Sequence, residues 1–122
     1  AKDFDYALEV LSDTFGTKQV FRKWNGLEFE RAFNRAIFDA LILLACDEMI
    51  RRDIAGNKQI FFDLFKDLCA NDGEFRDSIE GTTKSKSAIS TRVRKIADLC
   101  IRIGSSRSVI NRILEGYELD QI

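Results

Sequence analysis

The chain has 122 residues, of which 45% are apolar and 32% are charged, and its formal net charge at pH 7 is −1. This length and balance fit one soluble domain with a core of ordinary size. The sequence contains no histidine, which excludes Ser-His-Asp and Cys-His triads, His-containing zinc sites and histidine general bases.

Apolar residues recur at helical spacing from Phe4 to Phe15, which predicts a first amphipathic helix that Gly16 ends. The next segment, residues 17–27, contains an Asn-Gly turn pair and predicts an irregular connection. Within it we expect Trp24 to cover the edge of the core rather than to bind a ligand.

Residues 30–52 form the stretch around which we expect the rest of the chain to pack. They read ERAFNRAIFDALILLACDEMIRR, and positions 36–46 are apolar except for Asp39. A helix that is apolar on nearly every side leaves no face for water, so it must be surrounded by protein. The pattern predicts a buried helix over about 28–54. A carboxylate buried at Asp39 needs a partner, and Arg35 stands one turn earlier.

Further helices are predicted after this one. The apolar patterns cover 58–70, 74–80, about 87–103 and 109–114, and Gly, Asn or small hydroxyl residues separate them. Strand-like alternation is weak throughout the sequence. We therefore predict an all-α fold, a compact bundle of five to six helices around the buried helix.

The three cysteines, Cys46, Cys69 and Cys100, lie far apart and within apolar helical patterns. No CxxC pair is present, so we expect no metal site and no cofactor. An odd number of isolated thiols is typical of a reduced, cytoplasmic protein. We expect all three side chains to be small core residues rather than reactive thiols.

Positive charge is concentrated late in the chain, because residues 84–112 carry eight Lys and Arg against Asp98 alone. Hydroxyls and lysines at a helix start can bind phosphate, and the following cations can track a nucleic-acid backbone. The alternatives are an ordinary helix cap and a basic face that pairs with the acidic part of the same chain. The candidate phosphate or DNA contacts are Thr82, Thr83, Lys84, Ser85, Lys86, Arg92, Arg94 and Lys95.

Two stretches resemble one known family. FNRAIFDA, residues 33–40, is similar to a segment of the GmrSD-type family, the ParB-like-nuclease proteins of bacterial antiphage restriction. TTKSK, residues 82–86, followed by Arg92, resembles a later "TT-SK…R" segment of the same proteins. The order, the separation and the helical context also look similar, from about Phe4 to Cys100.

This resemblance implies that residues 1–122 are one helical domain, a C-terminal fragment of a longer protein. The family's catalytic centre lies in an N-terminal domain with an Asp-Gly-Gln-Gln-Arg-like motif, which this sequence lacks, and a chain without histidine holds no HNH domain. We therefore expect no catalytic residue and no enzyme activity on this chain. The first hypothesis is an accessory domain that supports that N-terminal catalytic domain and contacts DNA phosphate. The alternative is a protein–protein interaction module with no nucleic-acid role. No membrane role is expected.

Overall fold

Seven α-helices form the part of the chain that the computed structural model describes, residues 1–80 and 85–122. They are α1 (Lys2–Phe15), α2 (Arg35–Ala45), α3 (Glu48–Ala55), α4 (Lys58–Asn71), α5 (Gly73–Ile79), α6 (Lys86–Arg102) and α7 (Arg107–Gly116). Within these residues there is no strand, only an isolated antiparallel bridge between Trp24 and Phe29. The all-α prediction is confirmed. No helix in the described part is long and apolar enough to span a membrane.

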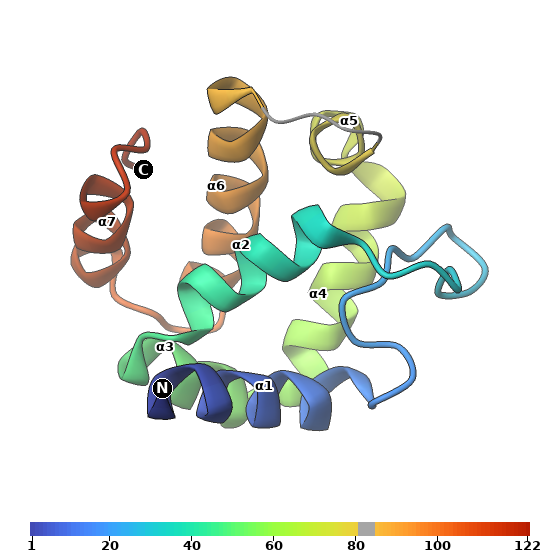
Figure 1. Cartoon of the computed structure of the whole chain (residues 1–122), viewed down its shortest axis with the longest axis horizontal. Coiled ribbons are helices and arrows are strands. Elements are labelled where there is room, and N and C mark those ends of the chain that lie inside the picture. The colour runs from blue at the N-terminus through green and yellow to red at the C-terminus, as the bar shows by residue number, and fades with distance from the viewer. Residues whose placement is uncertain (81–84) are drawn as a thin grey trace.

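The helices pack as a bundle in which α2 and α6 make contacts in several directions (Figure 1). Helix α2 packs against α1, α3, α5 and α6, and α6 also packs against α3, α4 and α5. In Figure 1, α1 and α3 lie along the lower edge, α4 and α6 stand above them, and α7 lies at the far left. Residues 16–34 run as a long connection on the right.

The core is built largely from phenylalanines and branched aliphatic residues. Phe61, Phe65 and Phe75 are fully or almost fully buried, and Phe15 meets Phe65 edge-on with ring centroids 5.1 Å apart. Edge-to-face contacts of this kind are favourable beyond the area that they bury. Leu41 and Leu44 on α2 are each only 1% exposed, as a core position requires.

The prediction of one continuous helix over about 28–54 is wrong, because the chain breaks between α2 and α3. Asp47 adopts an extended backbone and its side chain accepts hydrogen bonds from the N–H groups of Met49 and Ile50, which starts a new helix. The buried guanidinium of Arg51 donates to the carbonyls of Ala45 and Cys46, which end α2. Side chains thus satisfy the backbone groups on both sides of the break.

The first part of the predicted helix is also absent. Residues 23–30 instead form a hairpin-like loop, in which the Asn25 side chain accepts from the N–H groups of Leu27 and Glu28. Helix α2 begins only after Asn34, whose side chain accepts from Ile37 N at 2.9 Å. Asp39 is therefore on an exposed side of α2, where its carboxylate pairs with Arg35 at 2.9 Å as expected.

Candidate functional site

The residues predicted to contact phosphate lie in different environments. Thr82, Thr83 and Lys84 lie outside the described residues. Ser85 is the N-cap of α6, and its hydroxyl accepts from Ala88 N at 3.1 Å. Lys86 and Arg94 are exposed, and no ion pair joins either of them to another described residue. Of the described candidates, these two cations are the ones placed for contact with an external anion.

Arg92 is buried and links two helices. Its side chain is 6% exposed, and Nη1 donates a hydrogen bond of 2.9 Å to the carbonyl of Ser78 at the end of α5. Burial lowers the pKa of the Arg92 guanidinium, although the nearby carboxylate of Asp39 acts in the opposite direction. A guanidinium in this position connects α5 to α6, so Arg92 does not belong to a surface that follows a phosphate backbone.

Lys95 pairs with an acidic neighbour of the same fold, which was one of the alternatives for the basic segment. Its Nζ lies 2.8 Å from the carboxylate of Asp72, and this hydrogen bond raises the pKa of Lys95. Burial alone would raise the pKa of Asp72, but hydrogen bonds from Lys95 and from the N–H groups of Phe75 and Glu74 lower it below its ordinary value. The pair fixes the start of α5 to the middle of α6.

Two residues of the segments that resemble the nuclease family, Asn34 and Arg92, reach the end of α5. From the first stretch, Asn34 Nδ2 donates to the carbonyl of Ile79 at 3.0 Å. Arg92, which follows the second stretch, donates to the adjacent carbonyl of Ser78. The last carbonyls of a helix have no partner inside it, so side chains from α2 and α6 complete the end of α5. Sequence reasoning missed this role, because no local pattern shows which helix end an Asn or Arg will reach.

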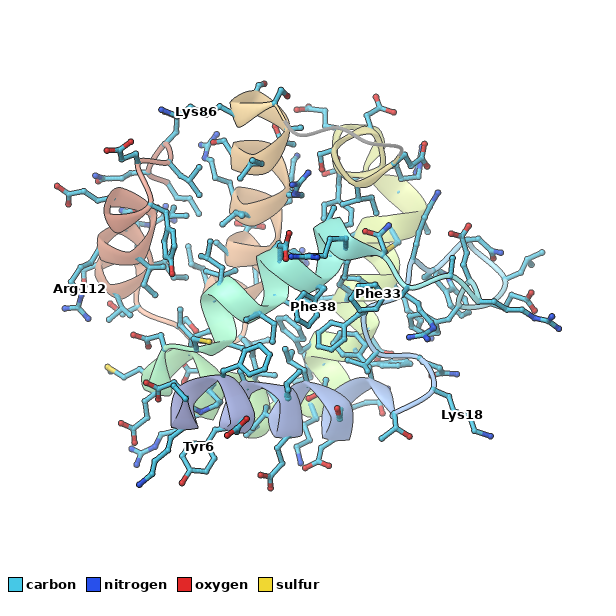
Figure 2. The ribbon with its side chains drawn as sticks, viewed as in Figure 1. Tyr6, Lys18, Phe33, Phe38, Lys86 and Arg112 are labelled. Carbon is cyan, nitrogen blue, oxygen red and sulfur yellow. The ribbon has the colours of Figure 1, made fainter. Side chains whose placement is uncertain are left out.

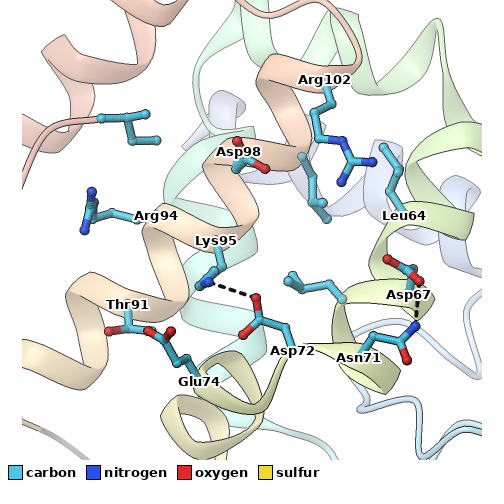
Figure 3. Close-up of a pocket in the computed structure, with 13 residues that line it drawn as sticks. Leu64, Asp67, Asn71, Asp72, Glu74, Thr91, Arg94, Lys95, Asp98 and Arg102 are labelled. Carbon is cyan, nitrogen blue, oxygen red and sulfur yellow. Dashed lines mark hydrogen bonds and ion pairs between the residues drawn. The ribbon is translucent and has the colours of Figure 1, made fainter.

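A groove of about 470 Å³ lies between α4, the start of α5, and α6 (Figure 3). Leu64, Leu68, Leu99 and Ile122 form its apolar part, of which Leu64 and Ile122 are half-buried and the other two are buried. We call it the α4–α6 groove. Its α4 and α5 side is acidic, and its α6 side is mainly basic. The charged residues are Asp67, Asp72 and Glu74 on the first side, and Arg94, Lys95, Asp98 and Arg102 on the second.

A different surface, between α1 and the start of α2, is aromatic. Phe33 is 51% exposed, and its ring centroid is 5.4 Å from that of Phe38 and 6.1 Å from that of Phe21. Phe33 and Phe38 lie next to each other in Figure 2. Phe4, on α1, continues the row at 6.4 Å from Phe38. Both ends of the row are exposed, Phe33 more than Phe4, and the rings of Phe21 and Phe38 between them attach the row to the core.

The three thiols are not disulfide-bonded, and two of them are deeply buried. Burial raises the pKa of Cys69 to about 11 and that of Cys100 to about 12. Cys46 is half-buried, and burial also raises its pKa. These environments agree with core residues and disfavour the thiolate form that a nucleophile needs. No group of three or more metal-binding side chains occurs within residues 1–80 and 85–122.

Comparisons with protein-family models, with curated proteins and with solved structures found no match.

Proposed function

We propose that this chain is a helical accessory domain that binds another protein segment, and that the α4–α6 groove is its docking surface. The observation that carries the proposal is the charge pattern of the groove, which has three cations and four carboxylates around the half-buried side chains of Leu64 and Ile122. A polyanion such as DNA would meet those carboxylates, and like charges at an interface are repelled. A protein segment can supply both signs of charge and the apolar side chains.

The occupant that fits this pattern is an amphipathic α-helix. An apolar stripe on the partner would face Leu64 and its neighbours. Basic residues on one flank would meet Asp67 and Glu74, and acidic residues on the other would meet Arg102. The existing ion pair between Lys95 and Asp72 lies within the groove and would fix the relative position of its two sides (Figure 3).

The resemblance to ParB-like restriction proteins suggests where such a helix would come from. In a protein of that kind, the partner segment would belong to the N-terminal catalytic domain, and the present chain would support that domain. The chain would then act in antiphage defence without carrying catalytic residues itself.

The test uses two labelled helical peptides of identical composition. Both carry Leu at helical spacing; in one, Lys and Glu occupy the flanks that match the groove, and in the other the flanks are exchanged. Exposed ion pairs contribute about 0.2–1 kcal/mol each, so we expect the matched peptide to bind about tenfold more tightly when several pairs form. Fluorescence anisotropy measures both affinities.

Variants of the domain make the test specific. The charge reversal Arg102→Glu should weaken the matched peptide, whereas Arg112→Glu, an exposed position on α7, should have no effect. Equal affinity for the two peptides, or an equal effect of the two variants, would show that the groove does not select a partner by its charges.

A second candidate function is contact with DNA phosphate, which the exposure of Lys86 and Arg94 favours. Binding to a random-sequence duplex that falls steeply as salt increases would support it, because phosphate contacts release counterions. If the double variant Lys86→Ala, Arg94→Ala kept the same affinity and the same salt slope, these two residues would not be DNA contacts.

A further inference from the structure

The aromatic row between α1 and α2 belongs to a larger apolar surface. Phe4, Phe33 and Phe38 form its centre, and Leu8 and Ile42 extend it on the two helices. We call it the α1–α2 surface. We propose that it binds a basic amphipathic α-helix of a partner protein. This proposal does not depend on the role of the α4–α6 groove, because the two surfaces have no residue in common.

Two rings of the α1–α2 surface stay open to water although their neighbours hold them in place. Phe33 is 51% exposed and Phe4 is 37% exposed. Phe38 is half-buried, and Figure 2 shows it beside Phe33, between the ribbons of α1 and α2. Leu8 and Ile42 follow Phe4 and Phe38 by one turn, so they lie on the same helix faces, and both are half-buried. Aromatic rings are enriched at interfaces, and rings that are already fixed need little ordering when a partner binds.

A hollow of about 370 Å³ adjoins the exposed ring of Phe33. Arg35 and Ala36 line it from the start of α2, and Glu30 lines it from the preceding loop. An apolar side chain of the partner can enter this hollow and cover the part of the Phe33 ring that the fold leaves in water. Aromatic residues that pair with a partner side chain in this way contribute a large share of the binding free energy at interfaces.

Both cations that line this hollow are already neutralised by carboxylates of the same fold. Arg35 pairs with Asp39 at 2.9 Å, and Lys23 pairs with Glu80. An acidic partner would have to compete with these two carboxylates for the cations. The described residues that line the hollow therefore offer an anion no unpaired cation.

Acidic side chains flank the surface on α1 and at the hollow. Asp5 and Glu9 follow Phe4 and Leu8 by one position on α1, and both are exposed. Glu30 lines the hollow, and no ion pair joins any of these three carboxylates to another described residue. Helix α1 as a whole has four carboxylates against one lysine. A partner with Lys or Arg on its flanks supplies the complementary charge.

These features select among the possible partners. Nucleic acid and anionic membranes are repelled by the same three carboxylates. A second copy of this chain, related by a twofold axis, would bring identical carboxylates to both sides of the interface. An extended peptide requires a free strand edge, and residues 1–80 and 85–122 contain only the isolated bridge between Trp24 and Phe29.

A helix meets the same requirements. It makes its own backbone hydrogen bonds, so it needs no strand edge. Its turns of about 5.4 Å match the spacing of the rings, whose centroids are 5.4 Å apart from Phe33 to Phe38 and 6.4 Å apart from Phe38 to Phe4. One apolar side chain per turn of the partner would therefore contact each ring in succession.

The experiment is a titration of the isotopically labelled 122-residue chain with two helical peptides, followed by amide chemical shifts. Both peptides have about five turns and the same stripe of Leu, and their flanks carry Lys in one and Glu in the other. We expect the Lys peptide to bind with a dissociation constant on the order of 100 µM. The Glu peptide should bind about tenfold more weakly, because it meets like charges. The shifts should map to residues 4–9 and 30–42, and shifts confined to α4 and α6 would contradict the proposal.

The variant Phe33→Ala tests the aromatic anchor. It removes an exposed ring, so the fold should be kept and the Lys peptide should bind about tenfold more weakly. Tyr117→Ala is the matched control, because it removes a ring that is 60% exposed and lies beyond α7, outside the surface. The control should bind as the parent chain does. If both variants had the same effect, the ring of Phe33 would not be an anchor and the proposal would fail.

The double variant Asp5→Asn, Glu9→Gln tests the acidic flank. Exposed ion pairs are individually weak, so we expect the Lys peptide to bind about fivefold more weakly, with an affinity that depends less on salt. Glu115→Gln combined with Glu118→Gln removes two exposed carboxylates near the end of α7 and should leave the affinity unchanged. An unchanged affinity in the first double variant would rule out a basic partner.

Two further measurements test the other partners. A dimer of the free chain, detected by sedimentation and dissociated by Phe33→Ala, would overturn the proposal in favour of a second copy. Attachment to vesicles of anionic lipid that the same variant abolishes would overturn it in favour of a membrane. The spectra report whether each variant is folded, and the comparison of the two peptides on the parent chain needs no variant. Equal affinities in that comparison would also overturn the proposal.

Discussion

Arg92 and Arg94 provide a direct test of how α6 is arranged, because they are identical residues on one helix in opposite environments. Arg92 is 6% exposed and bonded to Ser78 O, whereas Arg94 is exposed. Replacing Arg92 by Ala removes a partner of a carbonyl at the end of α5, which costs about 1–3 kcal/mol. It also removes the packing of the aliphatic stem, so we expect a total loss of about 2–4 kcal/mol. Arg94→Ala should change the free energy of unfolding by less than about 0.5 kcal/mol, since Ala is also a good helix former.

Urea unfolding monitored by circular dichroism measures both values. With a slope of about 1.5 kcal/mol/M, a loss of 3 kcal/mol lowers the midpoint by about 2 M. The slopes themselves should stay equal, because neither variant changes the surface that unfolding exposes. If Arg92→Ala lost less than about 0.5 kcal/mol, or if Arg94→Ala lost as much as Arg92→Ala, the guanidinium of Arg92 would not hold α5 to α6.

Three further predictions follow from burial and charge. Leu41→Ala and Leu44→Ala should each lower the free energy of unfolding by about 2–5 kcal/mol, measured by the same urea titration; negligible losses at both would remove α2 from the core. Iodoacetamide should alkylate Cys46 well before Cys100, because the thiol of Cys100 is buried and has a pKa of about 12. Mass spectrometry of a time course measures the order of alkylation, and the reverse order would contradict the burial of Cys100. Asp72→Asn should keep the N-cap oxygen of α5 but lose the ion pair, at a cost of about 0.5 kcal/mol at pH 7. Because folding lowers the pKa of Asp72, this stabilisation is present above the ordinary carboxyl pKa and is lost as pH falls through the folded pKa. The two proteins should therefore become equally stable once the pH lies below that folded pKa.

Local sequence signals were enough to locate the second half of the fold. Helix α4 was predicted over 58–70 and runs over Lys58–Asn71, and the pattern over 109–114 lies within α7, Arg107–Gly116. These helices have regular apolar spacing and end at Gly, Asn or Asp, so the local preferences agree with the tertiary structure. The 3.6-residue pattern therefore sufficed there.

The long apolar run misled the prediction because its ends are decided by distant contacts. Nothing in the local pattern shows that Arg51 turns back to the carbonyls of Ala45 and Cys46, or that Asp47 starts a helix rather than sitting inside one. Asp39 was expected to be buried, but α2 leaves one side open to solvent. An almost all-apolar sequence indicates extensive burial, yet it does not indicate whether the helix is continuous.

The candidate site was predicted less well, for a related reason. The helix over about 87–103 was predicted, but its buried face also includes Arg92, because α5 packs beside it. Arg92 was predicted to contact phosphate, and in the structure it links α6 to α5 instead. The hollow between α6 and the C-terminal tail could not have been predicted, since residues 119–120 approach α6 only through the fold.

Side chains from outside α5 bond to its last carbonyls, and this affects how the domain unfolds locally. A seven-residue helix is too short to persist alone in water. The carbonyl of Ile79 accepts a hydrogen bond from Asn34, 45 positions earlier, and the carbonyl of Ser78 accepts one from Arg92, 14 positions later. Opening α5 therefore breaks bonds to both α2 and α6. Its amide protons should exchange with solvent only when those two helices also separate, so the junction joins the early and late parts of the chain into one cooperative unit.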